Sequence, residues 1–137
     1  MSDSEVARSI EASVLSEVSL ANGAYVSFAT AGSPTSRSVR VRIYVSTTDA
    51  AQLTEAADAT FSTIWREMPI RPSSVGFQAF DGPKPANPTS GSRGNLDLAE
   101  VKDLLGVGYV GLAGQVLSLD ASELSARYGP WAGPASE

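Results

Sequence analysis

The 137-residue sequence contains no cysteine and no histidine, and only two of its ten basic residues are lysine. The lack of cysteine excludes disulfides, a thiolate nucleophile and Cys-ligated metals. The lack of histidine removes the usual ligand of tight zinc, copper or haem sites and the common general base near neutral pH. We therefore expect no catalytic residue set, no metal site and no cofactor, which favours a non-catalytic protein over an enzyme.

Long hydrophobic runs and a basic surplus are missing as well. The longest apolar stretches fall short of the ~20 residues of a membrane span, and the start, MSDSEVARSI, lacks the charged-then-apolar layout of a signal peptide. The net charge of −5 opposes the phosphate neutralisation that dominates nucleic-acid affinity. We expect a chain that is soluble as given, has no membrane span and does not bind nucleic acid, and the sequence indicates no compartment.

The length and composition are those of one globular domain. Hydrophobic residues make up 42% and charged residues 18% of the chain, so residues 1–137 are expected to form a single α+β domain. Residues 82–94, GPKPANPTSGSRG, contain no apolar side chain larger than alanine. We predict a flexible loop there, because this stretch cannot bury enough surface to order itself.

The alternation in residues 39–45 is the clearest structural signal. Valine or isoleucine at positions 39, 41, 43 and 45 alternates with Arg40, Arg42 and Tyr44, which predicts a strand with one core face and one polar face. An antiparallel hairpin to a preceding strand at 24–30 is expected across AGSPTS. Ser2 and Glu5 have capping-box spacing before an amphipathic helix over 5–17.

The remaining elements follow from apolar spacing and from Gly/Pro breaks. We predict a long helix over 49–67, strands at 74–80 and 114–120, a short helix within 96–105, and a last helix ended by Gly129-Pro130. The predicted fold is an α+β two-layer sandwich. Its three- to four-stranded, mostly antiparallel sheet carries the helices on one face, with a ferredoxin-like arrangement favoured.

The stretch GVGYVGLAG contains the pattern G-x-G-x-x-G at Gly106, Gly108 and Gly111. A dinucleotide site needs a strand before this pattern and a helix after it. The predicted order here is the reverse, and too few residues follow for a βαβ unit. We interpret Gly106 as the end of a helix and the later glycines as points of close backbone packing.

Three acidic pairs could suggest two-carboxylate chemistry. Asp97 with Glu100 and Asp120 with Glu123 have the spacing of helix-capping boxes, so capping is the preferred interpretation. Glu55 and Asp58 lie opposite the apolar stripe of their helix and are interpreted as solvated.

The candidate binding residues are Arg40, Arg42 and Tyr44 on the polar strand face, together with Trp131 near the C-terminal end. The two arginines could hold a carboxylate or phosphate, or could simply form a wetted face or protect a sheet edge. Trp131 could fold back onto the sheet or remain a contact point for a partner.

The stretches STIWREMP, SSVGFQAF and ASELSARYGPW follow one another in this order. Over residues 24–80 and 120–131 the chain resembles uncharacterised small ferredoxin-like domains of bacterial cell-envelope proteins and lipoproteins. The resemblance implies a ferredoxin-like fold and a cell-envelope location. It supplies no activity that can be transferred to this chain. The chain departs from such lipoproteins because it lacks a lipid-acceptor cysteine and a signal peptide.

The sequence assigns no specific activity. The first hypothesis is a non-catalytic protein-interaction or assembly module whose partner is a protein, with a homo-oligomer left open. The alternative is a small anionic-ligand binding protein or enzyme that uses Arg40, Arg42 and Tyr44.

Overall fold

The structure is a computed structural model that describes residues 3–30, 37–84, 95–111 and 114–131. Most of the predicted loop at 82–94 and Ser2 of the first predicted capping box lie outside the described residues. Within the described residues the elements, in chain order, are α1 (Asp3–Glu17), β1 (Gly23–Thr30), β2 (Arg37–Val45), α2 (Ala50–Glu67), β3 (Pro72–Asp81), α3 (Ala99–Leu105), β4 (Tyr109–Gly111), β5 (Val116–Asp120) and α4 (Ala121–Tyr128).

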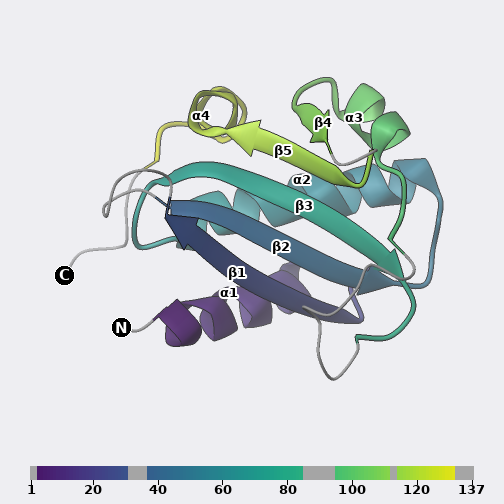
Figure 1. The fold of residues 1–137 in the computed structure, drawn as a ribbon, viewed down its shortest axis with the longest axis horizontal. Coiled ribbons are helices and arrows are strands. Elements are labelled where there is room, and N and C mark those ends of the chain that lie inside the picture. Colours follow the sequence, from purple (N-terminus) through teal and green to yellow (C-terminus); the bar gives the residue numbers. More distant parts are fainter. Residues whose placement is uncertain (1–2, 31–36, 85–94, 112–113, 132–137) are drawn as a thin grey trace.

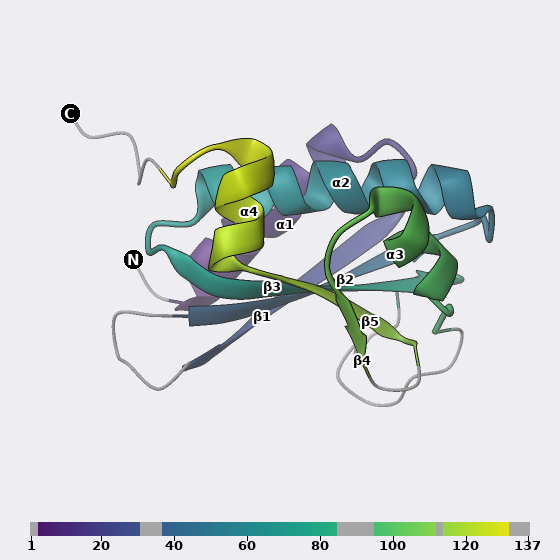
Figure 2. The same ribbon diagram turned by 90° about the horizontal axis from the view of Figure 1, so that it is seen from above.

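The described elements form two layers, a mixed sheet and a layer of helices on one of its faces (Figures 1 and 2). The strand order is β1-β2-β3-β5-β4. Among these strands every neighbouring pair is antiparallel except β2 and β3, which run parallel and are joined by α2. The predicted α+β sandwich and the β1–β2 hairpin are confirmed.

The sheet is larger than predicted, with five strands instead of three or four. The additional strand, β4, has three residues and lies in the glycine stretch after α3. The ferredoxin-like prediction is not confirmed. A ferredoxin-like sheet is built from split βαβ units, whose two parallel strands are separated by another strand. Here β2 and β3 are direct neighbours.

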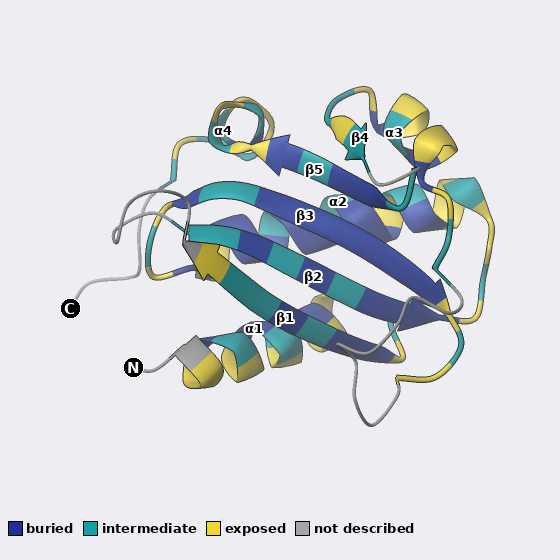
Figure 3. Ribbon diagram, viewed as in Figure 1, coloured by how far each residue is buried: buried dark blue, intermediate teal, exposed yellow. Residues whose placement is uncertain are grey.

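The core lies between β2, β3 and the apolar stripe of α2. The side chains of Val39, Val41, Ile43 and Val45 are at most 1% exposed, as the alternation predicts. Figure 3 shows this alternation along β2 as buried and intermediate residues in turn. Phe61 of α2 covers this face and packs against Phe77 of β3, with ring centroids 6.0 Å apart.

The helix ends confirm the predicted capping box of Asp120 and Glu123 and correct that of Asp97 and Glu100. The side chain of Asp49 accepts a hydrogen bond from the Gln52 amide, 2.9 Å, at the start of α2. Asp120 and Glu123 form the predicted capping box of α4. The predicted box of Asp97 and Glu100 is wrong, because α3 begins one residue later, with Leu98 as its cap. Asp97 instead accepts from the Ala99 amide, 2.9 Å, in a local turn.

The glycines after α3 take the roles expected from the sequence. Gly106 ends α3 in the left-handed region, with φ of 83°. The order is helix, glycines, strand, the reverse of a dinucleotide-binding turn. None of the helices in the described part of the chain is long and apolar enough to cross a membrane.

The edge strand β1 is partly protected by α1. The backbone N–H of Val26 donates to the Glu11 carboxylate, 2.8 Å, so a side chain of α1 occupies a donor on this strand. Unpaired donors of an edge strand invite pairing with another chain. This contact therefore reduces the capacity of β1 to recruit a further strand.

Candidate functional site

The predicted binding residues of β2 lie on the face of the sheet that the helices do not cover. Arg40, Arg42 and Tyr44 alternate with the buried core residues of β2, so they point to the opposite side. Their cross-strand neighbours complete a surface that we call the arginine face. It comprises Tyr25, Ser27, Arg40, Arg42, Tyr44, Gly76, Gln78 and Phe80.

Arg40 lies over β3, in the space that the missing side chain of Gly76 leaves. The Arg40 Nε is 3.0 Å from where a Cβ on Gly76 would be, and Arg40 Nη1 donates to Gln78 Oε1 at 3.4 Å. Burial, followed by the like charge of Arg42, lowers the pKa of Arg40 from its ordinary value. Within the described residues Arg40 forms no ion pair with a carboxylate. This guanidinium is therefore half-buried, and no described carboxylate neutralises its charge.

Arg42 and Tyr44 pack on an aromatic neighbour in β3. The Arg42 guanidinium lies over the Phe80 ring, 5.5 Å from its centroid, and the Tyr44 ring stacks on Phe80 with centroids 5.3 Å apart. Burial raises the pKa of the Tyr44 hydroxyl, although Arg42 acts in the opposite direction. Because Tyr44 is 3% exposed, it offers a partner little surface of its own.

Arg40 has no acidic neighbour across the strands. The register places it opposite Ser27 of β1 and Gly76 of β3. Lys84 adds a third positive charge, since its side chain lies against Gly23 at the end of this face. A surface of this kind on a protein of net charge −5 favours contact with an acidic group.

The structure excludes one of the interpretations that the sequence left open for the arginines. β2 lies between β1 and β3, so the edge-protection interpretation of Arg40 and Arg42 is wrong. The other two interpretations agree with the strand order: this side of the sheet either binds a partner or is only hydrated.

Trp131 does not join the arginine face. It is half-buried and packs against the hydrophobic core, on the other side of the sheet, with its indole nitrogen buried. The segment before it is anchored by Trp65, whose Nε1 donates to the Gly129 carbonyl at 2.8 Å. Of the two conformations considered for Trp131, the folded-back one is present. Its role as a contact residue stays a prediction.

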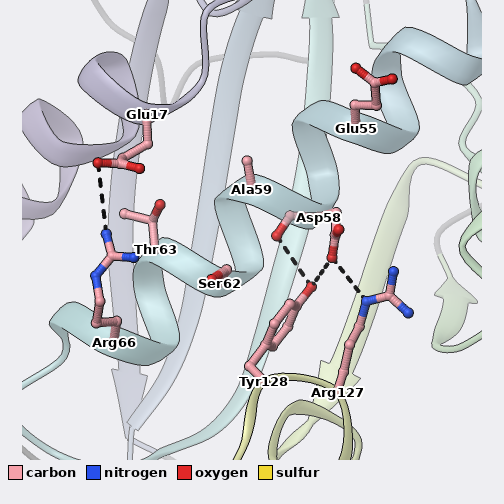
Figure 4. Close-up of a pocket in the computed structure, with 9 residues that line it drawn as sticks. All are labelled: Glu17, Glu55, Asp58, Ala59, Ser62, Thr63, Arg66, Arg127 and Tyr128. Carbon is pink, nitrogen blue, oxygen red and sulfur yellow. Dashed lines mark hydrogen bonds and ion pairs between the residues drawn. The ribbon is translucent and has the colours of Figure 1, made fainter.

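A second polar cluster lies on the helical side and joins α2 to α4 (Figure 4). Asp58 Oδ1 accepts hydrogen bonds from Tyr128 Oη at 2.5 Å and from Arg127 Nε at 2.9 Å. Burial alone raises the pKa of Asp58, but the hydrogen bonds from Arg127 and Tyr128 outweigh it and the pKa is lowered overall. Burial, followed by the bond to Asp58, raises the pKa of the Tyr128 hydroxyl well above its usual range.

The Asp58 cluster predicts a loss of stability in acid. The lowered folded-state pKa means that Asp58 stabilises the fold above its unfolded pKa of about 3.9 and ceases to do so as the pH falls through the folded value. With the side chain 44% exposed, the wild type should be more stable than Asp58→Asn by about 0.5–1 kcal/mol at pH 7. Urea unfolding at pH 7 and at pH 3 should show this difference shrinking in acid. The exposed substitution Asp103→Asn should not reproduce it, and a gap that grows in acid would contradict the assignment.

The sequence did not reveal the Asp58 cluster. The solvated interpretation agrees with the exposed position of Glu55 but is wrong for Asp58, which has two partners. Those partners are 69 and 70 positions away, and nothing in local spacing links them. Among the residues that the structure describes, no three Asp or Glu side chains are grouped so that they could hold a metal ion.

The chain matches no protein-family model, no curated protein and no solved structure. The resemblance to small domains of bacterial cell-envelope proteins therefore stays a prediction.

Proposed function

We propose that the protein is a non-catalytic interaction module whose arginine face binds an acidic segment of a protein partner. The observation that carries this proposal is the half-buried Arg40 guanidinium, which has Gln78 as its hydrogen-bond partner and no ion pair with a described carboxylate. A buried charge is costly unless it is paired. A carboxylate from a partner would supply the missing charge and relieve the repulsion between Arg40 and Arg42.

The layout of the charges favours an extended segment over a compact ligand. Arg40 and Arg42 are alternate residues of one strand, which places them about 6.5–7 Å apart along β2. Lys84 extends the positive surface toward the end of the strand. An extended peptide with an acidic residue at every second position has the same period, so successive carboxylates could meet successive basic side chains.

The proposal is tested with the peptide Ac-ESESESE-NH2 and its glutamine counterpart, Ac-QSQSQSQ-NH2. Wild-type protein is expected to bind the acidic peptide and not the neutral one, with an affinity that falls as salt is added. The double variant Arg40→Gln/Arg42→Gln should lose at least about tenfold in affinity, because hydrogen bonds to charged groups contribute about 1.5–3 kcal/mol each. Isothermal titration calorimetry measures both quantities.

The matched control is Arg8→Gln, which removes one positive charge from an exposed position on α1. If this control weakens peptide binding as much as the double variant, the attraction is a general charge effect and the proposal fails. Citrate serves as a compact anion. Arginine-dependent binding of citrate without binding of the peptide would contradict a protein partner and support the small-anion alternative.

A further inference from the structure

A groove of about 660 Å³ lies on the helical side of the molecule, away from the arginine face. It runs over α2 between the end of α1 and α4 (Figure 4). Its volume is within the ~300–1,000 Å³ of small-molecule sites. The groove is lined by Glu17, Glu55, Asp58, Ala59, Ser62, Thr63, Arg66, Arg127 and Tyr128.

Thr63 is the unusual residue of this groove. The hydroxyls of Thr54 and Thr60, on the same helix, donate to the carbonyls of Ala50 and Ala56 at 2.7 Å each. Thr63 is 1% exposed, yet in the described part of the chain its hydroxyl has no hydrogen-bond partner. Figure 4 shows this hydroxyl on the groove side of α2, between Glu17 and Arg66. Thr63 lines the groove, so its hydroxyl can form a hydrogen bond with water or with a ligand that displaces this water.

The charges around the groove are largely matched by one another. Arg127 contacts Asp58 at 2.9 Å, and Arg66 lies 4.0 Å from Glu17. Glu55 is left without an ion pair among the described residues, so the lining carries two positive and three negative side chains. This near balance gives the groove no strong preference for an anion or for a multiply charged cation.

The remaining lining chemistry suits a ligand that both donates and accepts hydrogen bonds. The carboxylates of Glu55 and Asp58 accept, the terminal nitrogens of Arg127 donate, and the hydroxyls of Ser62 and Thr63 do both. The side chain of Ala59 is small and leaves room on the floor, and the Tyr128 ring forms part of one wall (Figure 4). An aromatic wall offers an apolar surface beside these polar groups.

From these features we propose that the groove binds a small neutral polyhydroxylated ligand of the saccharide class. Each hydroxyl of such a ligand can donate to a carboxylate and accept from an arginine or a threonine, and its C–H face can lie against the Tyr128 ring. The Thr63 hydroxyl supplies the contact that distinguishes this groove from an ordinary charged helix surface. The inference is independent of the arginine face, which lies on the other side of the sheet.

The test is a titration of ¹⁵N-labelled protein, followed by amide chemical shifts, with glucose, N-acetylglucosamine, maltose and cellobiose as separate probes. At least one of these sugars is expected to cause saturable shifts centred on residues 55–66 and 127–128. Thr63→Val keeps the shape of the side chain and removes the hydroxyl. It should weaken binding by about three- to tenfold, the contribution of one hydrogen bond.

Stability measurements separate binding from folding. Thr63→Val should leave the urea midpoint unchanged or raised, because the hydroxyl has no hydrogen bond to lose. Thr54→Val, which removes a hydroxyl outside the groove, should bind the sugar as the wild type does. The proposal is overturned if none of the four sugars causes localised shifts, if Thr63→Val binds with wild-type affinity, or if spermidine occupies the groove where the sugars do not.

Discussion

Replacing Phe61 by alanine is expected to lower the free energy of unfolding by about 3–5 kcal/mol. Phe61 is fully buried between α2 and the sheet and packs on Phe77. The substitution removes a large apolar side chain and leaves a cavity that rigid strands on one side cannot fill. Because domains of this size have a total stability of about 5–15 kcal/mol, the urea midpoint of the variant should be strongly reduced at an unchanged m-value.

The control for Phe61→Ala is Leu104→Ala on α3. Leu104 is 55% exposed, so truncating it should cost no more than about 0.5 kcal/mol. Equal losses in the two variants would mean that the apolar stripe of α2 does not form the core described above.

The second large effect is expected for Gly108→Ala. Gly108 has φ of 107°, and a Cβ there would lie 2.9 Å from Leu117 Cδ1 and from Leu119 Cδ1. The left-handed backbone costs a non-glycine residue about 1–2 kcal/mol, and overpacking against buried leucines adds about 1–3 kcal/mol. The free energy of unfolding should therefore fall by about 2–5 kcal/mol in total.

Gly106→Ala isolates the backbone contribution to this effect. Gly106 also has a positive φ, 83°, but a Cβ there would meet no atom within 4 Å. Its variant should lose only the backbone part, about 1–2 kcal/mol. If Gly108→Ala is no more destabilising than Gly106→Ala in chemical unfolding, the close packing of this segment on β5 is not as described.

Much of the fold was predictable because its signals are local. The alternation along β2 predicted both the buried side and the side that carries Arg40 and Arg42. The apolar stripe of α2 and the Gly106 and Gly129 helix ends are also encoded by near neighbours in sequence. These are the elements for which prediction and structure agree.

The features that prediction missed have two different causes. β4 has three residues, which is too short for an alternation pattern, although its partner β5 is close in sequence. The other features depend on residues far apart in the sequence. The bond between Asp58 and Arg127 joins positions 69 apart. β2 and β3 pair directly and in parallel. Strand periodicity predicts which residues form a strand but not which strands become neighbours in the sheet.

The same limit applies to the two candidate sites. Arg40 and Arg42 could be proposed from the strand pattern alone, but their aromatic and uncharged neighbours come from β1 and β3. The groove around Thr63 is assembled by α1, α2 and α4. No local sequence pattern predicts this groove, because its residues belong to three separate helices.

The most direct test of the central claim is a chemical-shift map of the protein saturated with Ac-ESESESE-NH2. If the peptide binds to the arginine face, the largest chemical-shift changes are expected at the Nε–Hε groups of Arg40 and Arg42. The backbone amides of Tyr25 and Gln78 should also shift. Saturable changes that fall instead on Arg66 and Arg127, with the β2 arginines unaffected, would contradict the claim that this side of the sheet receives the acidic partner.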